Sequence, residues 1–219
     1  MDDISSEDIL LEEDESEMMH LTPAQLVDRM QETWINEIRA PEILPYKYEY
    51  VECLLEHINS MEENIETLQT ASLVKVVHQL EIDRFRYIIA SYLRTRLEKI
   101  ELHVFHILKE EDTRIEKNEL PYLSDGELQF AQEYKNSIEQ HFQSVLSFWP
   151  GMPPDDWKNN PVVPNLDSFV FLKSKENVEG VIIDDSDEND IVDLKEGSQV
   201  ILSYSKIADL LKNDKVSLL

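Results

Sequence analysis

The stretch SLVKVVHQLEIDRFRYIIASYLRTRLEKIELHVFHILK, residues 72–109, decides the fold. Its apolar residues recur at the spacing of one long helix, and they fall into two stripes. The first stripe is Leu73, Val76, Val77, Leu80, Tyr87 and Ile88, and the second is Ile82, Phe85, Ile89, Leu93, Leu97, Ile100 and Val104. A helix that is apolar on two faces must be covered on two faces. Helices of the same chain can cover one of them, so the excess predicts a subunit interface.

We assign this interface to the second stripe and to the arginines that interrupt it. The assigned residues are Ile82, Phe85, Ile89, Leu93, Arg94, Arg96 and Leu97. Because the planar guanidinium of arginine binds carboxylates in a bidentate manner, we expect Arg94 and Arg96 to form buried or interfacial ion pairs. A contact with DNA through the basic residues of this helix is the alternative.

Three further helices are predicted around the long one. Thr22, Pro23 and Gln25 form a capping box, with proline at the first helical position, and the helix that they open stops near Pro41. A second helix follows the apolar repeat from Val51 to Leu68, and a last one runs from the capping box of Ser124 and Glu127 to Pro150. Residues 21–150 therefore predict an all-helical bundle of about four to five helices.

The pattern changes after residue 150. Five prolines lie between positions 150 and 164, which predicts a linker over 151–166. Residues 167–219 then predict a small β-rich domain with strands at 169–172, 178–183, 191–194 and 199–204, a short helix at 206–212 and a last strand at 216–219. Phe169 to Leu172 are apolar at every position, which is typical of a strand buried on both faces. We therefore place Phe169, Phe171, Val216 and Leu218 in the core of this domain and assign the chain to the α+β class.

Charge and composition exclude several functions. The chain carries 46 acidic and 20 basic residues, a net charge of −26, which repels nucleic-acid phosphates and anionic lipid. Its single cysteine, Cys53, allows no internal disulfide, so a reducing compartment is expected. No signal peptide and no membrane-spanning run is predicted. The four glycines are all isolated, so no phosphate-binding loop can be drawn.

No group of residues predicts catalysis, a metal or a cofactor. His103 and His106 lie three apart on the long helix, but no matching pair elsewhere completes a zinc site, and we interpret both as surface residues. Cys53 lies in an apolar run, which is typical of a buried thiol. The acidic turn at 184–190 lacks the glycine and the terminal glutamate of a calcium loop, so we interpret it as a solvated loop.

Residues 1–20 hold nine acidic residues and no lysine or arginine, which predicts a disordered tail. Ile9, Leu10 and Leu11 form an apolar island within it. Such islands bind partner grooves as short helical turns. A solubilising tail with incidental leucines is the alternative.

Several motifs, in this order, resemble the Go (SLD-five) family of GINS complex subunits. They are Leu21-Thr22-Pro23-Ala24-Gln25-Leu26, Ala40-Pro41-Glu42, Met61-Glu62-Glu63-Asn64, Arg84-Phe85-Arg86-Tyr87-Ile88, Ser91-Tyr92-Leu93-Arg94-Thr95-Arg96-Leu97, Leu166-Asp167-Ser168-Phe169-Val170-Phe171-Leu172 and Asp193-Leu194-Lys195-Glu196-Gly197-Ser198-Gln199. The resemblance spans about residues 21–219.

The resemblance implies a nuclear, non-enzymatic subunit for DNA replication. Its family forms a heterotetramer with three related subunits, Ichi, Ni and San, which joins the MCM ring and the Cdc-forty-five protein in the CMG replicative helicase. It also implies that Asp8, Ile9 and Leu10 dock on the AND-one replisome hub. From the net charge and the ion pairs expected for the arginines, we expect any DNA contact to be at most indirect. A helical adaptor of another nuclear assembly is the alternative function.

Overall fold

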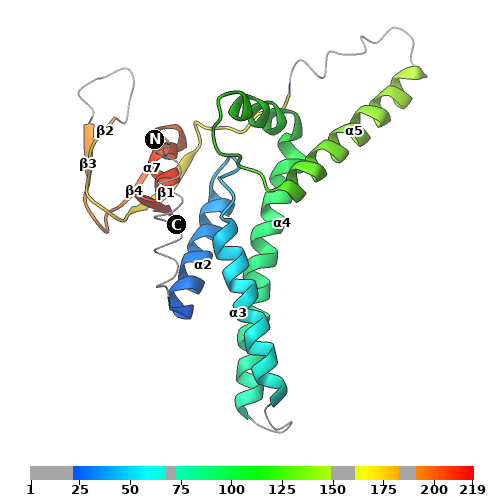
Figure 1. Ribbon diagram of the computed structural model, residues 1–219. Helices are drawn as coiled ribbons and strands as arrows, with labels where there is room; N and C mark the ends of the chain where they lie inside the picture. Colours follow the sequence, from blue (N-terminus) through cyan, green and yellow to red (C-terminus); the bar gives the residue numbers. More distant parts are fainter. Residues whose placement is uncertain (1–21, 68–72, 149–160, 183–190) are drawn as a thin grey trace, which may run out of the picture. The chain divides into compact units, whose positions relative to one another are not determined.

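The computed structural model describes residues 22–67, 73–148, 161–182 and 191–219 (Figure 1). Its helices are α2 (Pro23–Arg39), α3 (Tyr48–Thr67), α4 (Leu73–Glu116), α5 (Asp125–Ser147) and α7 (Tyr204–Lys212). Its strands are β1 (Phe169–Ser174), β2 (Val178–Ile182), β3 (Ile191–Leu194), β4 (Gln199–Ser203) and β5 (Val216–Leu218). A helical region followed by a small strand-rich region confirms the predicted α+β class.

Both predicted capping boxes set the start of a helix. At α2, the Thr22 backbone N–H donates to the Gln25 side chain at 2.9 Å, and the Gln25 N–H donates to the Thr22 hydroxyl at 3.4 Å. At α5, the Ser124 N–H donates to the Glu127 carboxylate at 3.0 Å, and the Glu127 N–H donates to the Ser124 hydroxyl at 3.3 Å. Each box satisfies backbone donors that have no partner within the helix.

The long helix α4 changes direction at one residue. His103 has the non-helical backbone angles φ −122° and ψ 26°. Its imidazole Nδ1 lies 3.2 Å from the Val162 carbonyl oxygen, and the side chain is buried. The prediction of a surface histidine is therefore wrong at this position, because the ring lies against the backbone of Val162, within the stretch predicted as the linker. Among the helices that the structure describes, none combines the length and the apolarity that crossing a membrane requires.

The strands form two small sheets. One has the order β4-β1-β5, with β1 antiparallel to both neighbours, and the other pairs β2 with β3. The three-stranded sheet has a buried face, on which Val170, Leu172, Leu202, Val216 and Leu218 pack together with the α7 residues Ile207 and Leu211. The predicted core positions of Val216 and Leu218 match this face, where their side chains are 0% and 3% exposed.

The prediction of a strand buried on both faces is wrong for β1. Its residues alternate between exposed and buried, and the side chains of Phe169 and Phe171 are 76% and 60% exposed. Successive side chains of a strand point to opposite faces. Helix α7 packs on only one face, so Val170 and Leu172 are buried while Phe169 and Phe171 remain uncovered within the described chain.

Contacts group the chain into two compact units. The first combines residues 1–34 and 47–91, of which 22–34, 47–67 and 73–91 are described. Figure 1 shows α3 beside the N-terminal part of α4 in this unit. The core of the unit consists of Leu26, Val27, Met30, Val51, Leu54, Ile58, Ile65, Ile82, Phe85, Ile88 and Ile89, all less than one tenth exposed.

The second unit combines residues 35–46 with 92–219, and it has two apolar cores. One core joins Ile43 and Leu123 to the C-terminal half of α4 and to Ala131 of α5. The other is the core of the small sheet, and it includes Ala40 and Leu44 from the segment between α2 and α3. The small strand-rich region therefore completes its core with residues that lie more than a hundred positions earlier in the chain.

Leu218→Ala is expected to destabilise the small sheet by about 2–5 kcal/mol, because it leaves a cavity where a fully packed side chain lay. The Leu218 side chain is 3% exposed, and its backbone N–H donates to the Asn36 Oδ1 at 2.8 Å. Limited proteolysis checks the expectation: cleavage after residue 160 should be much faster in the variant. Leu166→Ala is the matched control, since that side chain is 39% exposed. Equal cleavage rates for the two variants would contradict the account.

Candidate assembly surfaces

Among the residues that the structure describes, an apolar face along the N-terminal part of α4 has no cover. It consists of Leu73, Val76, Val77, Leu80 and Tyr87, whose side chains are 54–78% exposed. We call these five residues the α4 face. Their spacing puts them on one side of the helix, because residues three, four and seven apart lie above one another. Monomeric soluble proteins rarely expose apolar side chains in a contiguous patch, so this face has the character of a protein-binding surface.

The structure reverses the roles that the sequence analysis assigned to the two stripes. Ile82, Phe85 and Ile89 of the predicted interface are 0%, 4% and 5% exposed. They belong to the core of the first unit, where the Phe85 ring centroid lies 6.0 Å from that of His57 on α3. A side chain buried in its own chain cannot form the open face of that chain. The open face is instead the first stripe, apart from Ile88, which is 3% exposed.

The remaining predicted interface residues lie in the second unit. Leu93 and Leu97 are partly buried, and Leu97 packs against the core around Ile100. Arg94 is exposed, whereas Arg96 is 0% exposed. The structure therefore does not place these residues on one surface, and Arg94 is the only one of the seven whose side chain is classed as exposed.

Arg96 is the centre of a buried ionic network. Its Nε donates to the Glu127 Oε1 at 2.7 Å, and its Nη2 donates to the Glu127 Oε2 at 2.9 Å. Its Nη1 donates to the Glu37 Oε2 at 3.2 Å and to the Leu44 carbonyl oxygen at 2.6 Å. The Nη2 also donates to the Tyr122 carbonyl oxygen at 2.7 Å. One guanidinium thus ties together α2, the segment before α3, α4 and the start of α5.

The network compensates the cost of burying its charges. Burial by itself lowers the pKa of Arg96, but the hydrogen bond that Arg96 donates to Glu127 and the charge of Glu37 raise this pKa above its ordinary value. Lys99 binds Glu37 at 2.8 Å, and here burial outweighs the carboxylate, so that the pKa of Lys99 is lowered. The prediction of a buried ion pair is confirmed for Arg96, and its partners are carboxylates of the same chain.

A polar junction attaches the small sheet to the segment between α2 and α3. The Tyr204 hydroxyl donates to the Glu42 Oε1 at 2.8 Å, and the Lys212 Nζ lies 2.9 Å from the same oxygen. Burial, followed by the charge of Glu42, raises the pKa of Tyr204. Together with the bond from Leu218 to Asn36, this junction fixes α7 and β5 on residues 36–44.

Tyr204→Phe is expected to destabilise this junction by about 1.5–3 kcal/mol, the usual contribution of a hydrogen bond to a charged group. Urea unfolding at pH 7 checks this value. The folded-state pKa of Tyr204 lies above that of unfolded tyrosine, so this contribution is present below pH 10 and is lost as the pH rises further. The difference from the wild type should therefore shrink above pH 10. Tyr134→Phe is the control, and an equal effect of the two variants would argue against the junction.

Two candidates for chemistry can be checked among the described residues: the Cys53 thiol and groups of metal-binding side chains. Burial and the nearby charges of Glu56, Glu52 and Glu49 raise the pKa of Cys53, which disfavours the nucleophilic thiolate. No three metal-binding side chains come together within the ranges that the structure describes. The acidic turn at 184–190 and the motif Asp8-Ile9-Leu10 lie outside the described residues.

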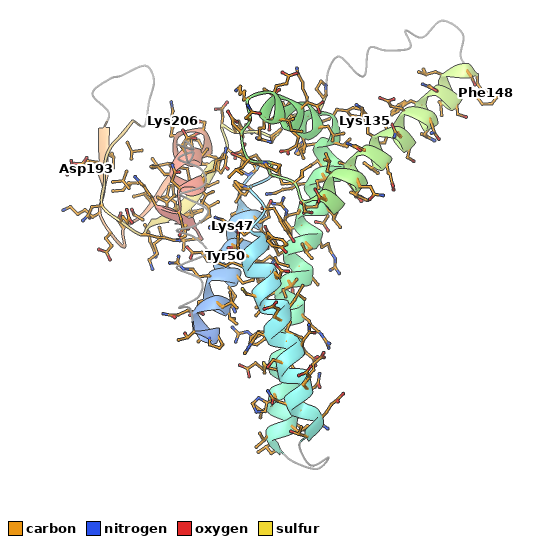
Figure 2. All side chains as sticks on the ribbon, in the orientation of Figure 1. Lys47, Tyr50, Lys135, Phe148, Asp193 and Lys206 are labelled. Carbon is orange, nitrogen blue, oxygen red and sulfur yellow. The ribbon has the colours of Figure 1, made fainter. Side chains whose placement is uncertain are left out.

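Figure 2 shows side chains along the full length of the helices.

Two family models and similar proteins of known name all indicate the same protein family. Residues 36–146 match the model of the GINS complex protein helical bundle domain, and residues 164–219 match that of the DNA replication complex GINS protein SLD5 C-terminus. The chain is 40% identical over 211 residues to "DNA replication complex GINS protein SLD5" of Homo sapiens and of Rattus norvegicus, covering 93% of this chain and 93% of each relative. It is 31% identical over 198 residues to the protein of that name from Schizosaccharomyces pombe, covering 85% of this chain and 88% of the relative.

Proposed function

The chain belongs to the SLD5 family of DNA replication complex GINS proteins, and from this premise we propose that it is a non-catalytic structural subunit of a heterotetrameric GINS complex. Its partners in the tetramer are the three related subunits Ichi, Ni and San. The tetramer joins the MCM ring and the Cdc-forty-five protein in the CMG replicative helicase, in the nucleus. In this proposal the MCM ring carries out hydrolysis, and the present chain holds subunits together.

The α4 face is the observation that carries this proposal. Its five side chains include Leu73 at 78% and Leu80 at 64% exposed, on a helix whose opposite side is already packed against its own chain. Burying a leucine or valine side chain contributes about 1.5–3 kcal/mol. Covering several of them at once supports stable association with another subunit, and it gives no support to an enzyme.

The environment of the basic residues of α4 supports the proposal that the chain does not bind DNA directly. Arg96 is enclosed by Glu37 and Glu127, and Arg86 binds Glu62 on α3. Arg84 and Arg94 are exposed, but they belong to a chain with a net charge of −26. A binding site for a phosphate backbone needs several uncompensated cations on one face. The subunit therefore acts on DNA through the motor that it helps to hold.

The experiment that tests this function is affinity capture of the tagged chain, followed by mass spectrometry. We expect the three sister subunits in equal amounts and the MCM and Cdc-forty-five proteins in smaller amounts. Capture of a different set of nuclear proteins would instead support a helical adaptor of another assembly. Recovery of the chain alone would contradict both functions.

Ile9→Ala with Leu10→Ala is expected to abolish binding to the AND-one hub and to leave the tetramer intact. Truncation of two apolar anchors removes most of the contact that a short helical motif makes in a groove. Pull-down of the purified tetramer with the hub measures the effect, and Glu12→Ala with Glu13→Ala is the control for the acidic surroundings. Unchanged binding of the Ile9 and Leu10 variant would show that the assignment of Asp8, Ile9 and Leu10 is wrong.

A further inference from the structure

A pocket with a volume of about 470 Å³ lies where α4 ends and the chain continues toward α5. Three cationic side chains line it, those of Lys109, Arg114 and Lys117. Tyr122 also lines it, from the segment between the two helices. We call this hollow the α4-end pocket. Its volume falls within the range of pockets that bind small ligands.

The chain itself holds Arg114 in a fixed position. Its Nη1 donates to the Glu111 Oε1 at 2.6 Å, and its Nη2 donates to the Glu110 Oε2 at 3.2 Å. The guanidinium carbon lies 3.6 Å from the Tyr122 ring centroid, and the Arg114 side chain is 13% exposed. An arginine has five N–H donors, so these two hydrogen bonds leave donors for a further acceptor. Arg114 is therefore a preorganised cation that can still bind an anion.

The two lysines of the pocket are less neutralised than Arg114. Lys109 is exposed and has no carboxylate within ion-pair distance among the described residues. Lys117 lies 3.9 Å from the Glu119 carboxylate, but both side chains are more than half exposed, and such pairs are weak. The other carboxylate of the pocket, Glu110, binds the arginine and lies 3.3 Å from the His106 Nε2. The pocket thus keeps a local excess of positive charge in a chain with a net charge of −26.

The carbonyl groups at the end of α4 do not compete with these cations. Unpaired carbonyls at the C-terminus of a helix disfavour an anion. Here the Glu119 N–H donates to the Arg114 carbonyl oxygen at 2.9 Å, and the Asn118 N–H donates to that of Ile115 at 3.1 Å. Asn118 has a φ of 56°, the left-handed conformation that this helix cap requires. The cationic side chains therefore determine the charge that the pocket accepts.

The surroundings of the pocket favour one phosphate group over a nucleic acid. Arg114 covers the Tyr122 ring, and the Lys212 Nζ lies 5.5 Å from the same ring centroid, so little of the ring is left for stacking with a base. A nucleic-acid backbone also needs an extended row of uncompensated cations, which the strongly acidic chain does not favour. A single dianionic group needs only local cations.

A phosphorylated side chain matches the three cations better than a carboxylate does. Phosphoserine and phosphothreonine carry a charge of about −1.5 to −2 at pH 7 and three strong acceptor oxygens. A carboxylate has one charge and two oxygens, and therefore leaves one cation of the pocket without an acceptor. Hydrogen bonds between ionised groups are also the strong ones, and arginine is suited to phosphate.

We propose that the α4-end pocket binds the phosphate group of a phosphorylated serine or threonine in a partner protein, with Arg114 as the fixed donor and Lys109 and Lys117 pairing with the remaining charge. This inference goes beyond the proposed function, because it adds a phosphorylation-dependent partner to a structural subunit. It does not depend on which sister subunits cover the α4 face, since the pocket is formed by residues 106–122.

Retention of the assembled complex on immobilised peptides tests the ligand. The peptides form a library with phosphoserine at a fixed central position, and two matched libraries have serine or glutamate there. We expect retention on the phosphoserine peptides to exceed that on both others about tenfold, and to fall with added salt. Equal retention on the glutamate peptides would overturn the assignment of phosphate. Stronger retention on a ten-nucleotide oligothymidylate would overturn the protein partner in favour of a nucleic acid.

Removal of the two lysines tests the pocket. Lys109→Ala with Lys117→Ala should reduce retention on the phosphoserine peptides about tenfold, because two charged donors are lost. Lys195→Ala with Lys215→Ala removes two exposed lysines from another part of the chain and is the matched control, with no expected effect. Equal retention of the lysine variant and the control would overturn the site.

Thr113→Glu blocks the pocket without removing a cation. Thr113 lines the pocket, is exposed, and lies four residues from both Lys109 and Lys117, so a glutamate there pairs with the two lysines on the helix surface. We expect loss of retention on the phosphoserine peptides, with an unchanged melting temperature and an intact complex. Ser137→Glu adds the same charge at an exposed position of α5 and should retain binding. If the complex forms and Thr113→Glu binds the peptides like the wild type, the inference fails and the proposed function does not.

Discussion

Arg96→Ala is expected to destabilise the second compact unit by about 3–5 kcal/mol, the effect of removing one partner of a buried ion pair. The side chain is 0% exposed, and its loss leaves the carboxylates of Glu37 and Glu127 in the interior, where they are 1% and 6% exposed. It also removes the donors for the Leu44 and Tyr122 carbonyl oxygens. Because these partners come from four separate segments, the substitution should loosen the unit as a whole.

Arg94→Ala is the matched control for this prediction. Arg94 lies two residues away on the same helix and is exposed, so its removal should change the free energy of unfolding by about 0.5 kcal/mol or less. Urea unfolding of both variants, followed by circular dichroism, provides the comparison. Equal midpoints for the two variants would show that the network does not hold the unit together.

Val77→Asp with Leu80→Asp is expected to weaken association with the sister subunits roughly 100–1000-fold, as loss of two dominant interface side chains does. Both side chains are more than half exposed, so their replacement should leave the fold of the first unit intact. Each aspartate places a charge where the proposed interface excludes water, and that charge has no counterion there.

Leu102→Asp separates this effect from a general effect of surface charge. Leu102 is on the same helix and is 63% exposed, but it lies beyond the α4 face. Titration of the labelled chain against the three purified sister subunits measures both variants. The idea of an α4 interface would be abandoned if the Val77 and Leu80 variant bound as tightly as the Leu102 variant.

Local signals in the sequence predicted the elements well. The capping boxes at Thr22 and Ser124 placed the starts of α2 and α5, because a cap depends on residues three positions apart. The predicted strands at 178–183, 191–194 and 199–204 agree with β2, β3 and β4 to within one residue. The predicted end of the long helix, residue 109, falls short of Glu116, since nothing in the local pattern marks whether a polar last turn continues.

The exposure of each face could not be predicted from these local signals. The two stripes of α4 are similarly apolar. Only the packing of the first unit determines that the stripe with Ile82, Phe85 and Ile89 is buried. Phe169 and Phe171 appear as core residues in the sequence, yet the sheet has α7 on a single face. In each case the sequence shows that an apolar face needs a cover, and it does not show whether its own chain or another chain provides it.

The buried network around Arg96 illustrates the same point for charges. Glu37 lies 59 positions before Arg96, and Glu127 lies 31 positions after it, so no spacing rule connects them. Glu127 had a visible local role in the capping box of α5, and the structure gives it the second role of binding Arg96. The pairing depends on the tertiary fold.

In the proposed function, this chain is a structural subunit that is complete only with its partners. Light scattering coupled to size-exclusion chromatography tests it directly, with the chain purified alone and with the three sister subunits. The account predicts one 1:1:1:1 assembly for the co-expressed proteins, and self-association or aggregation for the chain alone, because its apolar faces are then uncovered. A monodisperse monomer at micromolar concentration that unfolds cooperatively and does not bind the sister subunits would contradict it.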